Sequence, residues 1–168
     1  MSQVNEAVKI LSGLIGDICT PIKVIKDYEA DPEFQKKNKE IFRQCVYRLC
    51  LQALALNMAK YVEFCRKYSK IVNDNAPQHS KPMNLFQEKI KQKEVMGFRN
   101  DYVGHIQKDS EKRILTENEI DAYISKIFGN DALIFFKWVW PEGFESKPPE
   151  SSLVGIIVAL RDALRAKL

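Results

Sequence analysis

The feature that most constrains this fold is the stretch between Pro32 and Pro77, which contains neither glycine nor proline. These two residue types are the ones that most often interrupt a helix. Apolar side chains recur within the stretch at helical spacing, namely Ile41, Cys45, Leu49, Ala53, Leu54, Leu56, Met58, Tyr61 and Val62. The pattern predicts a helix over about residues 32–74. A helix of about 40 residues would be about 60 Å long, so it either bends or extends beyond a compact domain towards a partner.

The remaining segments also carry a helical period, and no alternating pattern is long enough to predict a β-strand. We expect further helices over about residues 3–28, 84–97, 99–107, 116–128, 131–140 and 151–168. Their expected boundary signals are a kink or end at Pro21, N-caps at Asp31, Asn84 and Asp131, a capping box from Thr116 to Glu119, and a stop at Gly129. The sequence therefore predicts an all-α, up-and-down bundle of about five to seven helices with one long second helix.

Length and composition indicate a single domain over residues 1–168. A chain of 168 residues and 19.4 kDa is close to the usual size of one domain. Its 26 Lys and Arg residues against 22 Asp and Glu residues give a net charge of +4. This mild excess permits a polyanionic partner without requiring one, because a nucleic-acid interface depends on local clustering of the charge.

The cysteines and the lengths of the apolar runs indicate the cellular compartment. Cys19, Cys45, Cys50 and Cys65 are scattered through helical patterns without a CxxC pair, so we expect free thiols and no metal site. The amino-terminal residues lack a basic segment followed by an apolar one, and no apolar run approaches the roughly 18 residues of a membrane span. We therefore expect a cytoplasmic protein without a membrane partner. No phosphate-binding glycine loop or other cofactor motif occurs, so no cofactor is expected.

The candidate functional residues lie in the segment Phe98-Arg99-Asn100-Asp101-Tyr102-Val103-Gly104-His105. His105 is one of two histidines in the chain, and Arg99 with Asn100 precedes it by six and five positions. An arginine that stays charged, an amide and a group that titrates near neutral pH suit phosphodiester chemistry. The segment resembles the signature of the HEPN domain, a helical family whose active site is marked by an arginine, a polar residue and a histidine four to six positions later.

The resemblance implies a metal-independent endoribonuclease with Arg99, Asn100 and His105 as catalytic residues. It implies a HEPN-like core over about residues 30–130, with a C-terminal helical extension over residues 131–168. HEPN domains usually form homodimers in which two arginine–histidine pairs face each other across an RNA-binding cleft. Many act as toxins or in antiviral defence, which implies an antitoxin or a defence-system protein as a further partner.

Helix geometry independently favours a dimer. On a straight α-helix, six residues turn the chain by about 600° and advance it by about 9 Å. Arg99 and His105 would then point about 120° apart, so their side chains would meet only through the long reach of an arginine at a helix start or across an interface with a second copy. Asp101 lies four positions before His105 on the same face and would orient its imidazole. Tyr102, beside Asp101, is the second supporting residue.

RNA is the substrate that suits Arg99, Asn100 and His105, because its ribose 2′-OH is an internal nucleophile. Two histidines in a dimer would take the proton from that oxygen and give one to the leaving 5′-oxygen. Arg99 would stabilise the negative charge on the phosphorus, and Asn100 would hold a phosphate oxygen or fix the rotamer of Arg99.

Basic residues flank the motif on its carboxyl side. We expect Lys108, Lys112 and Arg113 to contact RNA phosphates, in which case binding would weaken steeply with salt. Gln107 stands where HEPN toxins that are silenced by nucleotidylation carry a tyrosine, so that modification is not expected to control this chain.

A second interpretation stays open, in which the chain is a non-catalytic helical module. The long helix and the aromatic segment over residues 135–140 would then mediate dimerisation, partner binding or RNA binding. Accessible Arg99 and His105 side chains in a shared cleft favour the enzyme, whereas burial of both favours the module.

Overall fold

The computed structural model describes residues 2–103, 111–129, 132–141 and 148–168. These ranges contain seven α-helices and no β-strand, which confirms the all-α prediction. The helices are α1 (Gln3–Ala30), α2 (Glu40–Asn75), α3 (Ser80–Gln92), α4 (Val95–Phe98), α5 (Glu117–Phe128), α6 (Ala132–Val139) and α7 (Leu153–Arg165). Short 3-10 turns cover Lys37–Lys39 and Pro77–His79, and a π-helical turn covers Arg99–Val103.

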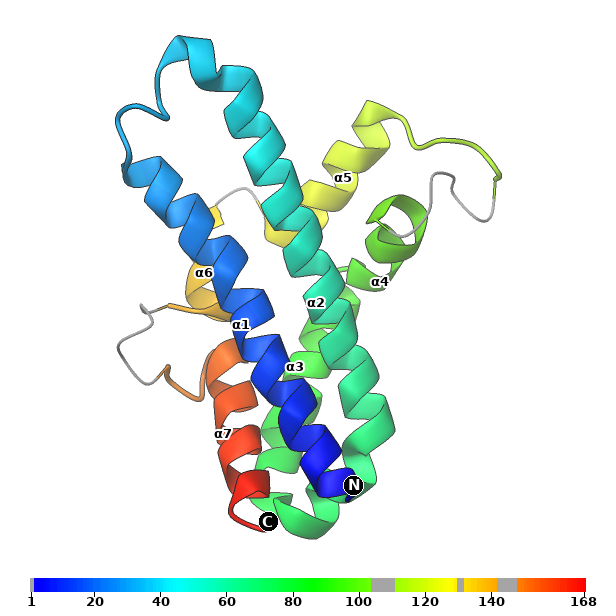
Figure 1. Cartoon of the computed structure of the whole chain (residues 1–168). Coiled ribbons are helices and arrows are strands. Elements are labelled where there is room, and N and C mark those ends of the chain that lie inside the picture. Colours follow the sequence, from blue (N-terminus) through cyan, green and yellow to red (C-terminus); the bar gives the residue numbers. More distant parts are fainter. Residues whose placement is uncertain (1, 104–110, 130–131, 142–147) are drawn as a thin grey trace.

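Helices α1 and α2 form an antiparallel hairpin, against which α7 and α3 pack at the lower end (Figure 1). Helix α1 does not end at Pro21 but continues to Ala30, with Pro21 buried inside it. Helix α7 packs along α1, and its apolar residues belong to the same hydrophobic cluster as those of α1 and α2. The C-terminal helix is therefore a wall of the main core.

The long second helix is present, but it begins at Glu40 and not at Pro32. Asp31 does not cap it, because its carboxylate accepts a hydrogen bond from the backbone N–H of Glu33 at 2.9 Å within a tight turn. The turn folds Phe34 back onto Tyr28, where the ring centroids lie 4.0 Å apart and Phe34 is buried. Burial of this aromatic ring accounts for the late start of α2.

The predicted N-cap at Asn84 is also wrong. The 3-10 turn after α2 runs directly into α3 at Ser80, so Pro82 lies in the first turn of α3, where its missing N–H costs no hydrogen bond. Thr116 and Glu119, in contrast, form the predicted capping box, and Gly129 ends α5 with a φ of 75° that favours glycine. Asp131 lies outside the described residues.

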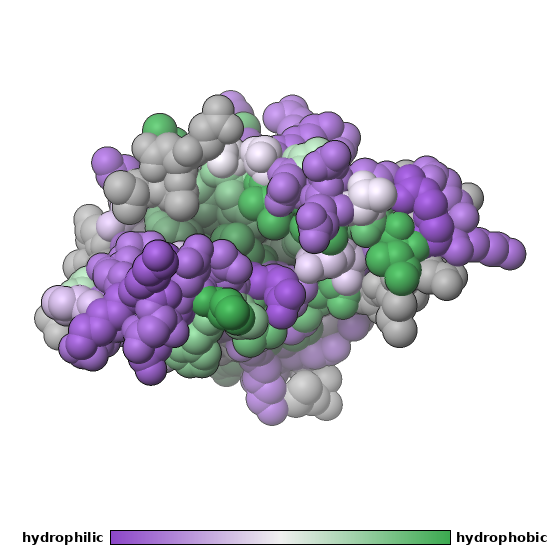
Figure 2. Space-filling model, turned by 90° about the horizontal axis from the view of Figure 1, so that it is seen from above, coloured by the Kyte–Doolittle hydropathy of each residue, from purple (hydrophilic) through white to green (hydrophobic). Residues whose placement is uncertain are grey.

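The core is not spread evenly along α2. Twelve of its residues from Cys50 onwards are buried, including Leu54, Met58 and Tyr61, whereas none is buried between Glu40 and Leu49. Ile41, Phe42 and Leu49 are 78%, 53% and 62% exposed. Viewed onto this end of the molecule, hydrophobic residues line a hollow that hydrophilic residues surround (Figure 2).

All four cysteines are free thiols, as predicted. Burial raises the pKa of Cys19 and of Cys65 to about 12, and it also raises the pKa of Cys50, while Cys45 is only half-buried. Within the described ranges, no three His, Cys, Asp or Glu side chains are grouped to hold a metal ion. No helix in these ranges has both the length and the apolar character needed to span a membrane.

Candidate functional site

Arg99 begins a π-helical turn that continues the four-residue helix α4. Glu94, in the left-handed region at φ 55°, separates α4 from α3. Because a π-turn pairs residues five apart, the angle expected between Arg99 and His105 on a straight α-helix does not apply to this half of the motif. π-Turns inside helical segments occur frequently at functional sites. His105, Gln107 and Lys108 lie outside the described residues.

The guanidinium of Arg99 is held by two partners. Its Nη2 donates to Oε1 of Glu63 on α2 at 2.9 Å, and its Nη1 donates to Oδ1 of Asn100 at 3.0 Å. The side chains of Arg99 and Glu63 are 34% and 39% exposed. Asn100 therefore fixes the rotamer of Arg99, and the guanidinium remains within reach of a ligand in solvent.

Asp101 and Tyr102 take different positions in the π-turn. The carboxylate of Asp101 accepts a hydrogen bond at 2.8 Å from the hydroxyl of Tyr123 on α5. Burial, followed by that bond to Asp101, raises the pKa of Tyr123 to about 12. Tyr102 is half-buried with its ring over Phe98, at 5.1 Å between centroids. Asp101 thus ties the motif to α5, and Tyr102 ties it to the core.

Gly97 favours the close approach of α5 to the π-turn. A Cβ at Gly97 would lie 3.2 Å from the Tyr123 hydroxyl, which is closer than ordinary packing allows. A side chain at position 97 would therefore push Tyr123 away by a few tenths of an ångström and strain its hydrogen bond to Asp101.

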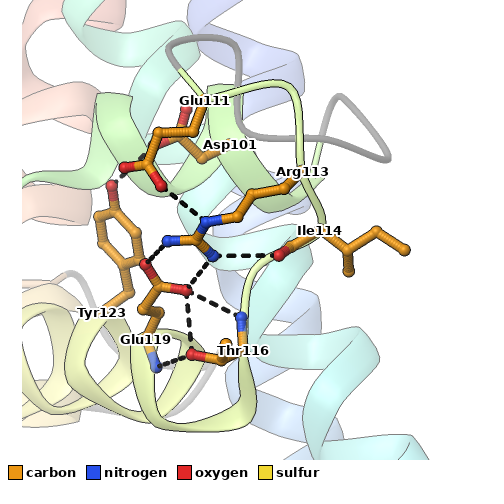
Figure 3. A network of polar contacts seen from close by, with 7 residues as sticks. All are labelled: Asp101, Glu111, Arg113, Ile114, Thr116, Glu119 and Tyr123. Carbon is orange, nitrogen blue, oxygen red and sulfur yellow. Dashed lines mark hydrogen bonds and ion pairs between the residues drawn. The ribbon is translucent and has the colours of Figure 1, made fainter.

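Arg113 is engaged in a network that fixes the start of α5 (Figure 3). Its Nη1 and Nη2 donate to the two carboxylate oxygens of Glu119 at 2.8 and 2.7 Å, and its Nε donates to Glu111 at 2.6 Å. The hydrogen bond from Arg113, followed by those from Thr116, holds the pKa of Glu119 well below its usual range. The positive charge of Arg113 is therefore already paired with two carboxylates, whereas Lys112 is exposed.

A groove between α1 and α2 adjoins the Arg99 contact through Glu63, which lines it. Its volume is about 340 Å³, and it contains the side chains of Lys9, Lys60 and Lys67. Lys67 contacts Glu6 at 3.2 Å, and Lys60 lies 3.7 Å from Asp17. The groove is therefore mixed in charge, with a small excess of cations.

Two residues of the candidate site could not be predicted from the sequence. Glu63 lies 36 positions before Arg99, and Tyr123 lies 22 positions after Asp101. Glu63 is one charged residue among many on a long helix, and Tyr123 looks like an ordinary member of the apolar face of α5. Only the packing of α2 and α5 against the π-turn selects them.

No protein-family model and no curated protein matches the chain. A solved structure is similar over nearly its full length, namely integron cassette protein Vpc_cass2 from the mobile metagenome of V. paracholerae. The two share 35% sequence identity with a TM-score of 0.83, over 98% of each chain. This chain belongs to the same family as that cassette protein. The likeness covers the whole bundle and assigns no reaction.

Proposed function

We propose that the protein is a metal-independent endoribonuclease of HEPN type. The observation that carries the proposal is the pairing of Arg99 with Asn100 in a half-exposed π-turn that leads towards His105, fixed by Glu63 from another helix. Such an arginine is pre-organised before substrate binds, which is the requirement for electrostatic stabilisation of a phosphorane-like transition state.

The contacts of Arg99 leave it able to bind a phosphate. A guanidinium has five N–H donors, and the bonds to Glu63 and Asn100 use two of them. Arg66, one helical turn after Glu63, is exposed on the neighbouring surface of α2 and adds a second cation for the RNA backbone. Lys112 would contact phosphates further along the strand. Arg113, already paired, would contribute least to binding.

His105 is the proposed proton-transfer residue. In a homodimer, one copy would accept the proton of the 2′-OH and the other would protonate the leaving 5′-oxygen. We place this activity in the cytoplasm, as a toxin or a phage-defence effector that an antitoxin or another defence protein restrains. The origin of the related cassette protein in a mobile metagenome is in keeping with such a role.

The test is cleavage of a single-stranded RNA in the presence of a chelator. Wild-type protein should cleave it, and His105→Ala should lower the rate by about 100-fold or more, the usual contribution of general acid–base catalysis. His79→Ala is the matched control, because His79 is the only other histidine and lies in the turn before α3. Equal cleavage by wild type and His105→Ala, or activity that the chelator abolishes, would contradict the proposal.

The second candidate is a non-catalytic dimerisation module. It is favoured by the exposed Ile41, Phe42 and Leu49 at the start of α2, which a second copy of the chain would cover. Both candidates are dimers, so RNA cleavage separates them, and light scattering after size-exclusion chromatography tests whether the exposed apolar residues form the dimer contact. A dimer that Ile41→Ser with Leu49→Ser converts to a monomer, together with wild-type protein that leaves RNA intact, would support the module.

A further inference from the structure

A second concave surface lies between α3, the end of α5 and α6, and shares no lining residue with the Arg99 contacts. Its volume is about 500 Å³, within the usual range for small-molecule sites. Phe128, Phe135 and Trp138 form its apolar walls, and Lys89, Gln92 and Lys93 lie along its edge. Apolar walls with a few polar groups are typical of ligand-binding sites, and this surface combines aromatic walls with a cationic edge.

The aromatic walls are well ordered by mutual contacts. The rings of Phe128 and Phe135 meet edge-on at 4.7 Å between centroids, and Phe135 lies 5.9 Å from the ring of Trp138. Phe128 and Phe135 are 5% and 3% exposed, whereas Trp138 is half-buried. The walls are therefore fixed in place by the core, and Trp138 offers its remaining surface to the pocket.

Of the two lysines at the edge, Lys93 is partly withdrawn from water, whereas Lys89 is exposed. The ammonium of Lys93 donates to the backbone oxygen of Ile127 at 2.8 Å, at the carboxyl end of α5, and lies 5.8 Å from the centroid of the Phe135 ring. Burial lowers the pKa of Lys93, because its charged form is less well solvated at this position. Lys89 lies over the ring of Phe86, at 5.3 Å from the centroid.

The lining of the pocket has one sign of charge. It includes two lysines and no aspartate or glutamate among the residues that the structure describes. A partly desolvated cation beside apolar walls gains most from an anion that brings its own apolar surface, because such a ligand pairs the charge and fills the pocket together. A polyanion such as RNA would pair the lysines but leave the remaining surface of Trp138 uncovered.

We propose that this pocket binds an amphipathic carboxylate of the medium-chain fatty acid type. Its carboxylate pairs with Lys93 and Lys89, and its alkyl chain lies against Phe128, Phe135 and Trp138. The ligand is bound and not transformed, and its site is independent of the proposed ribonuclease activity.

Calorimetric titration with three probes of equal chain length tests the charge requirement. Decanoate should bind at least about tenfold more tightly than decanol, a difference of about 1.4 kcal/mol, and decylamine should bind more weakly than both. The tryptophan fluorescence should change in a saturable manner, because Trp138 lines the pocket. Equal affinity for the three probes, or no saturable binding of decanoate, would overturn the proposal.

Charge-removing variants locate the site. Lys89→Gln and Lys93→Gln should each weaken decanoate binding by about tenfold while leaving decanol binding unchanged, and Lys93→Arg should retain it. Lys137→Gln is the matched control, since Lys137 is an exposed lysine of α6 that does not line the pocket. Because Lys93→Gln also removes the bond to Ile127, Lys89→Gln decides the question if that variant unfolds. Wild-type decanoate affinity in a folded Lys89→Gln variant would refute the assignment.

Discussion

The two ends of α2 follow the same helical pattern but have opposite environments. Residues from Cys50 to Val72 supply twelve buried side chains to the core, whereas the ten residues from Glu40 to Leu49 supply none. Figure 1 shows the reason, because the tip of the α1–α2 hairpin rises above the helices that cover its lower part. Apolar periodicity thus predicts where a helix forms, but the neighbouring helices decide which part of it contributes to stability.

The same substitution at the two ends of α2 should have very different effects on stability. Leu54 is fully buried and Leu49 is 62% exposed, so one helix offers two leucines in opposite surroundings. Leu54→Ala should lower the free energy of unfolding by about 2–5 kcal/mol, because it leaves a cavity. Leu49→Ala should change it by less than about 0.5 kcal/mol. Urea unfolding followed by circular dichroism measures both.

Equal losses for the two leucine variants would contradict the comparison. They would mean that the exposed end of α2 is covered in solution. Repeating the measurement over a range of protein concentrations would then show whether a second copy of the chain covers it, since stability that depends on concentration indicates self-association.

The π-turn is attached to α5 by the hydrogen bond from the hydroxyl of Tyr123 to the carboxylate of Asp101. Tyr123→Phe should cost about 1 kcal/mol, the usual net value of a hydrogen bond. The pKa of Tyr123 is raised to about 12 in the fold, above its usual value near 10. The stabilisation is therefore complete below about pH 10 and is lost as the pH rises through about 12. Chemical denaturation of both proteins from pH 7 upwards measures this window.

Tyr102→Phe is the matched control for that experiment. It removes the hydroxyl of a tyrosine that lies within the π-turn, next to Asp101, and it keeps the ring that packs on Phe98. A loss in Tyr102→Phe as large as that in Tyr123→Phe would show that the bond to Asp101 is not what fixes the turn.

The smallest expected effect concerns Glu119. Glu119→Gln keeps a capping-box side chain but removes the charge that Arg113 pairs with. Because the folded pKa of Glu119 lies below its usual value, its stabilisation is present above about pH 4 and is lost as the pH falls further. The variant should melt slightly below wild type at pH 7, and the gap should close in acid. Glu117→Gln, which removes a carboxylate from the same exposed turn, is the matched control. A pH-dependent gap of equal size in Glu117→Gln would show that the pairing of Glu119 with Arg113 is not the cause.

Local chemistry accounts for what the sequence predicts correctly. The absence of helix breakers places most of α2, and the Thr116, Glu119 and Gly129 signals place both ends of α5. These features depend on neighbours three or four positions apart, which a sequence displays directly. Two of the wrong boundaries, at Asp31 and Asn84, are overruled by the burial of Phe34 and by a proline that the first turn of α3 tolerates. A third is the helix end expected near Gly97, because α3 ends at Gln92 and Glu94 takes a left-handed conformation.

The candidate site is only half visible in the sequence. The motif selects Arg99 and Asn100, whose side chains are hydrogen-bonded to each other. Glu63 and Tyr123 come from helices distant in the chain, and no local pattern marks a residue for a contact made across a bundle. The charge of Arg113 likewise suggests a contact with RNA, but in the structure this charge is paired with Glu111 and Glu119.

The unequal burial of the four cysteines has a practical consequence. Three of them have raised pKa values and lie in the core, which keeps them as slow-reacting thiols at neutral pH. Cys45 alone is half-exposed, and it lies on the uncovered end of α2. Cys45 is therefore a natural attachment point for a fluorophore or spin label, which would report contact of another molecule with this end of α2.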